Sequence, residues 1–348
     1  MIDTSATSIQ SVSIHHVAVN VDDAGVQHSD QPVNIDTDNL HENLLQYFLS
    51  SFKTPEFFNF KMPDDNLELN PMGNLAAEIF DNPVNIHEKS KKIADYLYLQ
   101  SNHPKIKSGD LLVCYFDDVL IEDEMVSAIG IFKNEEKDTF LKLKKRGGIY
   151  DIKVDKGIAV SRLQKGCLIL NTEKEEGYKV CIIDKIAKEG DAAYWKTEFM
   201  SLRNRVDNFH ITRDTIQATK SFIEEKLKLE AQVEKADEAQ ILNKAQEYFK
   251  SLDRFNEAEY ESSLFEDDSR RLDFQNYKRE YEQKRSVELP DQFDISQPAV
   301  RSQSRVFKSV IKLDRNFHIY VHGDRSKITR GIDEDGKRFY KLYYDTEA

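Results

Sequence analysis

The sequence predicts an α+β fold, with an antiparallel β meander and flanking helices, a helical middle segment and a small C-terminal β unit. Three observations predict it: short apolar runs separated by turn residues in residues 111–183, apolar residues at helical spacing in residues 191–285, and further short β-type runs after residue 305. With 348 residues, of which 39% are hydrophobic, the chain is long and apolar enough for about two or three packed units.

The N-terminal part begins with a strand and two amphipathic helices. Alternating apolar residues in 11–21 predict the strand, and the alternation places His15 and His16 on opposite faces. Since metal ligands must converge on one point, we interpret both histidines as ordinary strand residues. Apolar residues at helical spacing predict one helix over residues 38–52 and a second between Pro83 and His103.

Six short β-type runs then follow one another closely. They are Leu111–Phe116, Met125–Phe132, Phe140–Leu143, Tyr150–Val154, Cys167–Leu170 and Tyr178–Ile183. The segments between them are turn material, such as Gly147-Gly148, and are too short to hold crossover helices. The pattern favours an antiparallel meander and argues against a nucleotide-binding α/β fold.

The organisation predicted along the chain has four parts: an N-terminal α+β domain (1–190), a helical segment (191–285), a linker (286–304) and a basic β unit (305–348). The linker prediction rests on Pro290, Pro298 and the polar residues around them, and we expect limited proteolysis to cut there first. The C-terminal unit is too small to be stable by itself, so we expect it to dock on the meander.

Charge is distributed unevenly along the chain. The 49 basic and 62 acidic residues give a net charge of −13, which argues against a histone-like coat on DNA, because non-specific affinity comes from neutralised phosphates. Residues 1–138 hold 9 basic and 24 acidic residues, a net of −15, whereas residues 139–166 and 301–330 each hold 8 basic and 2 acidic residues, a net of +6. This polarity predicts two basic patches, which docking of the C-terminal unit on the meander would join in one surface.

The basic patches supply the predicted contacts with nucleic acid. Gly147-Gly148 would let the backbone come close to a phosphate, while the long side chains around it neutralise the charge. Alternation in residues 306–313 puts Lys308 and Lys312 on an exposed face and Phe307 on a buried one. The alternative is that these cations only solvate exposed strands. The predicted nucleic-acid-binding residues are Lys142, Lys144, Lys145, Arg146, Lys153, Arg203, Arg205, Arg305, Lys308, Lys312, Arg315, Arg325, Lys327 and Arg330.

Common catalytic signatures are absent from the sequence, including the glycine-rich phosphate loops and the zinc motif H-E-x-x-H. A metal-dependent nuclease needs only two carboxylates and a lysine, and Asp110 with Glu135-Glu136-Lys137 is one candidate, although a charge run in a turn usually serves solubility. We predict that the protein is not an enzyme and holds no metal or cofactor. Cys114, Cys167 and Cys181 lie in apolar runs and are expected to be reduced core residues.

Neither a membrane-spanning run nor a signal peptide is recognisable in the sequence. The apolar runs are far shorter than the roughly 20 residues that cross a bilayer, and residues 1–10 lack the basic and apolar regions of a signal peptide. We therefore expect the protein in the cytoplasm.

Four segments together resemble one protein family. They are the opening strand Ile14–Val19, the apolar run Gly109–Phe116, the segment Tyr194–Phe209 with Arg203 and Arg205, and the closing segment Phe307–Tyr344. In order and texture they resemble the bacterial nucleoid-associated protein family typified by NdpA, also called YejK-like. The resemblance implies association with the bacterial nucleoid and no known enzymatic role, and it supplies no binding residues to carry over.

Three hypotheses for the function follow. In the first, the basic patches contact DNA phosphates while the acidic N-terminal half faces away from DNA or towards a protein partner. In the second, which the net charge of −13 motivates, the chain is an adaptor that a DNA-bound protein recruits to the nucleoid. A metal-dependent nuclease is the third.

Overall fold

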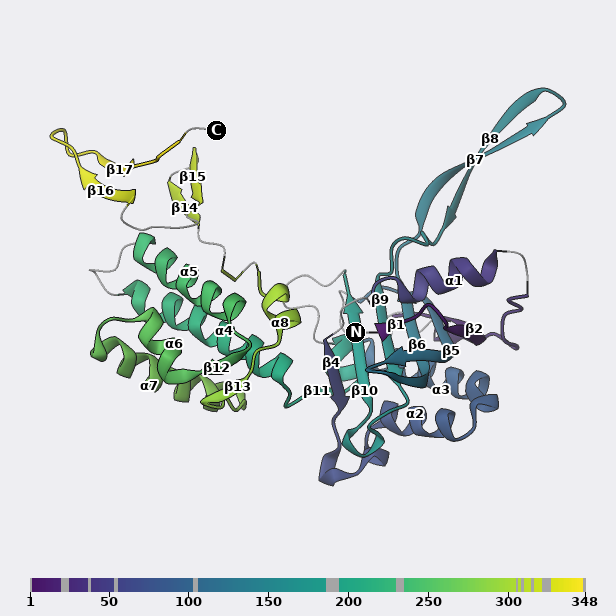
Figure 1. Ribbon diagram of the computed structural model, residues 1–348. Coiled ribbons are helices and arrows are strands. Elements are labelled where there is room, and N and C mark those ends of the chain that lie inside the picture. The colour runs from purple at the N-terminus through teal and green to yellow at the C-terminus, as the bar shows by residue number, and fades with distance from the viewer. Residues whose placement is uncertain are drawn as a thin grey trace. The chain divides into compact units, whose positions relative to one another are not determined.

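The computed structural model describes residues 2–19, 25–36, 39–52, 56–102, 106–185, 194–229, 235–304, 306–307, 310–313, 316–320 and 327–346. The chain divides into two compact units, residues 1–205 and 206–348 (Figure 1). Residues 194–204, which the sequence groups with the helical segment, belong to the first unit. Every helix among the described residues is too short or too polar to span a bilayer.

An antiparallel sheet, nine-stranded within the described residues, forms the centre of the first unit. All six runs of the predicted meander are strands, and the large antiparallel sheet with its helices confirms the α+β class. Across the sheet the order is β11 (Leu202–Asn204), β4 (Phe57–Phe60), β10 (Lys179–Asp184), β9 (Lys165–Leu170), β6 (Glu124–Asn134), β5 (Gly109–Ile121), β2 (Ser8–Val17) and β3 (Val26–Gln27), and β1 (Ile2–Asp3) pairs with β5.

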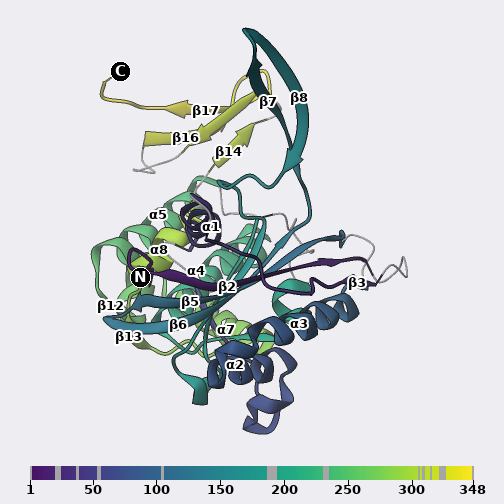
Figure 2. The ribbon, with the colours of Figure 1, turned by 90° about the vertical axis from the view of Figure 1, so that its right-hand side faces the viewer.

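Helices cover both faces of this sheet (Figure 2). Helix α1 (Leu40–Leu49) packs on one face, and α2 (Pro71–Asp81) and α3 (Ile86–Gln100) pack on the other. Successive residues of β5 point to opposite faces, so that each face contributes to a separate core cluster. Short helical turns connect these elements at η2 (Pro63–Asp65), η3 (Leu67–Leu69), η4 (Pro83–Asn85) and η5 (Lys174–Glu176).

Helix α2 is an element that the sequence analysis does not predict. It begins at Pro71, and the side chain of Asn70 accepts hydrogen bonds from the backbone N–H groups of Met72 and Gly73. Asparagine before a helix and proline at its first position are both favourable starts. These start signals are local in the sequence. The apolar face of α2 can be recognised only from its packing against the sheet.

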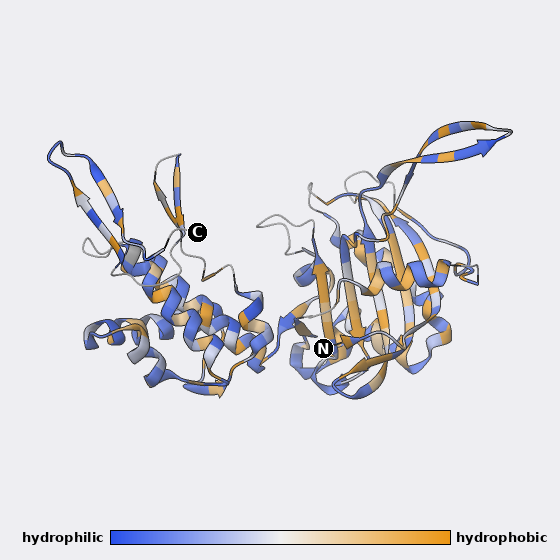
Figure 3. Ribbon diagram, turned by 45° about the horizontal axis from the view of Figure 1, so that its top comes forward, coloured by the Kyte–Doolittle hydropathy of each residue, from blue (hydrophilic) through white to orange (hydrophobic). Residues whose placement is uncertain are grey.

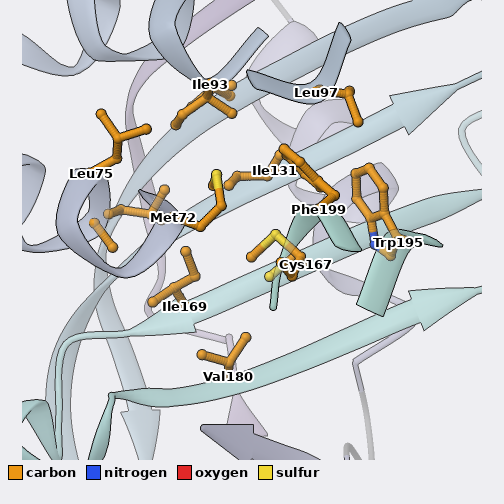
Figure 4. Packing of buried hydrophobic residues seen from close by; sticks show 14 of the residues in the cluster. Met72, Leu75, Ile93, Leu97, Ile131, Cys167, Ile169, Val180, Trp195 and Phe199 are labelled. Carbon is orange, nitrogen blue, oxygen red and sulfur yellow. The ribbon is translucent and has the colours of Figure 1, made fainter. Parts of the chain in front are cut away.

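The core beneath α2 and α3 holds the chain's single tryptophan (Figure 4). Trp195 lies in the π-helical turn η6 (Tyr194–Phe199), is fully buried, and packs against Phe199 with 4.9 Å between ring centroids. The three cysteines are buried in β5, β9 and β10, as predicted, and burial raises the pKa of their thiols.

The second unit is a helical bundle around an aromatic core. Asp207, Asn256 and Asp267 cap the starts of three of its helices by accepting backbone hydrogen bonds. Its helices are α4 (Asn208–Glu225), α5 (Lys235–Ser251), α6 (Glu257–Leu264), α7 (Asp268–Arg285) and α8 (Gln297–Ser302), with the turn η7 (Leu227–Leu229) after α4. The predicted helical segment is therefore present, and a strand, β12 (Arg254–Asn256), interrupts it.

Residues 286–304 pack as part of this bundle, so the prediction of a weakly packed linker does not hold. β13 (Gln292–Asp294) pairs with β12, and the ring of Phe293 stacks on that of Phe255 with 4.6 Å between centroids. Leu289, Ile295 and Val300 are buried in the same core. The prolines that suggest a linker lie beside a short strand and in the first turn of α8, where proline is tolerated.

Two β hairpins end the chain: β14 (Val310–Leu313) with β15 (Phe317–Tyr320), and β16 (Ile328–Ile332) with β17 (Arg338–Leu342). Val306 and Phe307 precede β14 and are buried in the helical core, so the predicted alternation from residue 306 is wrong at its start. Ile311 and Ile328 pack with Ala239 of α5. These contacts are with the bundle, and docking of the C-terminal unit on the meander stays a prediction.

Phe293 provides a test of this packing. Replacing a buried phenylalanine by alanine typically lowers the free energy of unfolding by about 3–5 kcal/mol, so we expect Phe293→Ala to destabilise the second unit by that amount. Urea unfolding followed by far-UV circular dichroism measures it. The matched control is Phe317→Ala, because 64% of the surface of Phe317 is exposed and the expected change is below about 0.5 kcal/mol. Equal stabilities of the two variants would restore the linker interpretation.

Candidate nucleic-acid interface

The basic turn predicted between residues 139 and 166 is the tip of a two-stranded β arm. Strands β7 (Asp138–Arg146) and β8 (Ile149–Gly157) pair with each other and with no other described strand, and they extend away from the sheet (Figure 1). Gly147 and Gly148 join them in a two-residue turn with φ of 52° and 89°. Glycine adopts these angles without strain, so this turn sets the register of the arm.

The register sorts the side chains of the arm into two faces of different character. Residues directly opposite each other share a face, and neighbours along a strand alternate between faces. The basic face carries Lys142, Lys144, Arg146 and Lys153, together with Phe140, Ile149, Asp138, Asp151 and Asp155. The apolar face carries Leu141, Leu143, Tyr150, Ile152 and Val154, together with Thr139, Lys145 and Lys156. Figure 3 shows apolar residues recurring along both strands.

Lys145 differs from the other predicted contacts of the arm, because it lies on the apolar face. It stands opposite Tyr150, and its Nζ atom is 5.5 Å from the centroid of that ring. A lysine over an aromatic ring is weakly attracted to it. Lys144, Lys145 and Arg146 are consecutive in sequence, but they do not form one cluster.

The cations of the basic face are available to a ligand. Lys142 is 3.8 Å from Asp155, and about half of each side chain is exposed, so this pair contributes at most about 1 kcal/mol and can give way to a phosphate. Between residues 142 and 153 the chain holds five cations and one carboxylate, a net charge of +4. The positive charge is therefore concentrated in the outer part of the arm.

A glutamine fixes the root of the arm, where the chain leaves and re-enters the sheet. The buried side chain of Gln164 accepts hydrogen bonds from the backbone N–H groups of Glu135 and Glu136, at 2.8 and 3.0 Å, and donates to the carbonyl of Glu136 at 2.7 Å. The outgoing chain is thus tied to the returning chain. Arg162 adds a more exposed link, 2.8 Å from Asp138.

Two buried ion pairs lie beneath this root. Lys133 pairs with Glu135 at 3.0 Å and donates to the carbonyl of Lys107 at 2.7 Å, while Lys165 pairs with Asp184 at 2.7 Å. Both ammonium groups also lie within 5.8 Å of the ring centroid of Tyr194. Burial lowers the pKa of Lys133 and raises that of Tyr194. Buried charges persist only when paired, so these contacts hold the ends of β6 and β9 in one geometry.

The other predicted contacts are less favourably placed or lie outside the described residues. Arg205 is only partly exposed and pairs with Glu173 at 2.5 Å, so it is less available to a ligand than Arg203, which is exposed. Lys327 is paired with Asp345, and Arg330 is exposed in β16. Outside the described residues lie Arg305, Lys308, Arg315, Arg325 and the side chain of Lys312.

Comparison with known proteins decides the family. The family model described as nucleoid-associated protein YejK matches residues 13–338, nearly the whole chain. The chain belongs to this family. The match confirms the resemblance seen in the sequence, and it includes the arm, its root and most of the second unit. No curated protein matches this YejK-family chain.

In this YejK-family chain, the residues considered for a nuclease, Asp110 and Glu135-Glu136-Lys137, do not form a metal site. Asp110 lies 2.9 Å from Nδ1 of His16 and 2.8 Å from Nζ of Lys137. Burial alone would raise the pKa of Asp110, but the hydrogen bonds from Lys137 and His16 outweigh burial and lower it. Glu135 instead pairs with Lys133. Among the described residues, no three histidine, cysteine or acidic side chains are grouped so that they could hold a metal ion.

Sequence reasoning missed a buried polar cluster between β2 and α3. Nε2 of His15 lies 2.7 Å from the hydroxyl of Ser90, and Nδ1 accepts from the backbone N–H of Ser29 at 3.2 Å. Nε2 therefore carries the proton and donates to Ser90, so His15 cannot act as a base towards this serine. Burial, and then the neighbouring His28 and His87, lowers the pKa of His15 to about 4. The cluster joins the helix to the sheet.

The root ion pair makes a testable prediction about stability. Glu135→Ala leaves Lys133 buried without its carboxylate, so we expect the free energy of unfolding to fall by about 3–5 kcal/mol. Urea unfolding followed by the fluorescence of Trp195 measures the first unit. Glu136→Ala is the matched control, because Glu136 pairs with the exposed Lys107 and its loss is expected to leave the free energy of unfolding nearly unchanged. A similar small effect of both substitutions would contradict the prediction.

Proposed function

We propose that this YejK-family chain associates with the bacterial chromosome in the cytoplasm by binding DNA directly, without catalysing a reaction. The observation that carries the proposal is the arm, in which Lys142, Lys144, Arg146 and Lys153 share one exposed face. Lysine and arginine side chains neutralise phosphates, and this contribution supplies nearly all of the affinity in non-specific binding.

The dimensions of the arm suit double-stranded DNA. The major groove is about 12 Å wide and admits a two-stranded β ribbon. Cations at alternate positions of one strand, such as Lys142, Lys144 and Arg146, recur about every 7 Å, close to the rise of two base pairs. The basic face can therefore follow a DNA strand over several phosphates.

The salt dependence of DNA binding tests the role of the basic face. Each lost phosphate contact lowers the slope of log K against log salt concentration by about 0.9, so we expect the triple variant Lys142→Ala, Lys144→Ala, Arg146→Ala to lower it by about 2–3. Fluorescence anisotropy with a labelled duplex, titrated with salt, measures the slope.

A control variant removes the same charge elsewhere. Lys250→Ala, Arg279→Ala, Lys284→Ala replaces three exposed cations of the helical bundle, and its slope is expected to equal that of the natural protein. Equal slopes for the arm variant and the natural protein would overturn the role of the arm. A chain that does not bind duplex DNA at low salt would overturn direct binding and favour recruitment by a DNA-bound protein.

The absence of catalysis is tested separately. We expect no cleavage of duplex DNA, single-stranded DNA or RNA when the protein is incubated with Mg²⁺ or Mn²⁺, because Asp110 is held by His16 and Lys137 and does not converge with Glu135. Gel analysis of the nucleic acids measures cleavage. Cleavage that Asp110→Ala abolishes would show that the protein is a nuclease.

A further inference from the structure

The apolar face of the arm is not covered by any described part of the chain. Between 61% and 69% of the surface of each of its five apolar side chains is exposed, whereas those of β5 and β6 are mostly buried. They are Leu141, Leu143, Tyr150, Ile152 and Val154. A two-stranded ribbon that packs against nothing is marginally stable in water, and contiguous exposed apolar surface marks an interaction site.

The residues of this face are complementary to themselves. When two copies meet face to face about a twofold axis along the arm, β7 of one copy faces β8 of the other. Each residue then meets the residue that the register places opposite it in its own hairpin. Aliphatic residues meet aliphatic residues, and Lys145 meets the ring of Tyr150.

In the other twofold arrangement the axis lies across the arm, and each strand faces its own counterpart in the second copy. When this axis lies level with Lys142 and Lys153, Leu141 meets Leu143 and Tyr150 meets Lys156. In neither arrangement does a lysine meet a lysine, and the face carries no carboxylate. Self-association in these arrangements therefore places no lysine directly opposite another lysine.

We propose that the apolar face of the arm is the contact between two copies of this chain. Homodimer contacts are richer in apolar surface than other protein surfaces, and twofold pairs are the commonest assemblies. Pairing supplies the packing partner that an isolated ribbon lacks, and it leaves both basic faces pointing outwards. The inference concerns association of the protein with itself and stands whether or not the protein binds DNA.

The size of the contact indicates its strength. Nine residues per strand make a strip about 30 Å long and two strands wide, which is at the low end of the range for specific interfaces. We therefore expect a pair that dissociates on dilution, with a dissociation constant in the micromolar range.

The test uses the full chain without DNA. Sedimentation equilibrium over about 1–100 μM protein measures the dissociation constant of the pair. The double variant Leu143→Thr, Ile152→Thr removes four aliphatic side chains from the paired arms but keeps residues that favour strands and pair well across them. We expect it to weaken the pair at least about 100-fold, or to be monomeric throughout.

The matched control is Ile149→Thr, because Ile149 is 75% exposed but lies on the basic face. We expect its dissociation constant to equal that of the natural protein, and that of Lys142→Ala, Lys144→Ala, Arg146→Ala to remain close to it. Hydrogen exchange provides a second measurement, since protection of the arm amides should rise with protein concentration in all of these proteins except the double variant. A monomeric natural protein, or a double variant that pairs as well as the control, would overturn the proposal.

Discussion

The pairing of β6 with β9 is the constraint on which the rest of the first unit depends. Lys133 stands directly opposite Lys165 in the register, so the chain must leave the sheet and return to it at neighbouring points. The residues between them form a hairpin, and the glycine turn closes that hairpin with a two-residue loop. The sheet thus determines where the arm begins, and the turn determines which side chains share a face.

The same pairing places two lysines side by side in the interior, which would be unfavourable without compensation. Glu135 and Asp184 each neutralise one of them, and the ring of Tyr194 lies close to both. Because these contacts come from β6, β10 and η6, the geometry of the root requires the whole sheet to be folded. A rigid root is what allows an otherwise unsupported ribbon to present its cations in one direction.

Much of the fold could be predicted from the sequence, because alternating apolar residues and turn residues are local signals. All six runs of the meander are strands, and the basic hairpin around Gly147-Gly148 is an arm. Which residues of β8 share a face with which residues of β7 could not be predicted, because that depends on register. Alternation along β7 by itself separates Lys145 from Lys144 and Arg146. Two further features depend on tertiary contacts that the sequence does not reveal. Phe293 is buried by its stacking on Phe255, and Arg205 is held by Glu173, which is distant in sequence.

An acidic net charge is compatible with DNA binding through such an arm, because distance separates the two kinds of charge. The arm is about 30 Å long, whereas charges in physiological salt are screened beyond about 8 Å. The carboxylates of residues 1–138 therefore have little effect on a phosphate at the arm's tip, but they repel DNA that approaches the sheet itself. Under the proposed function, the −15 of this region and the +4 of residues 142–153 would act in the same direction, since both would restrict DNA to the arm. A single total for the chain hides this arrangement.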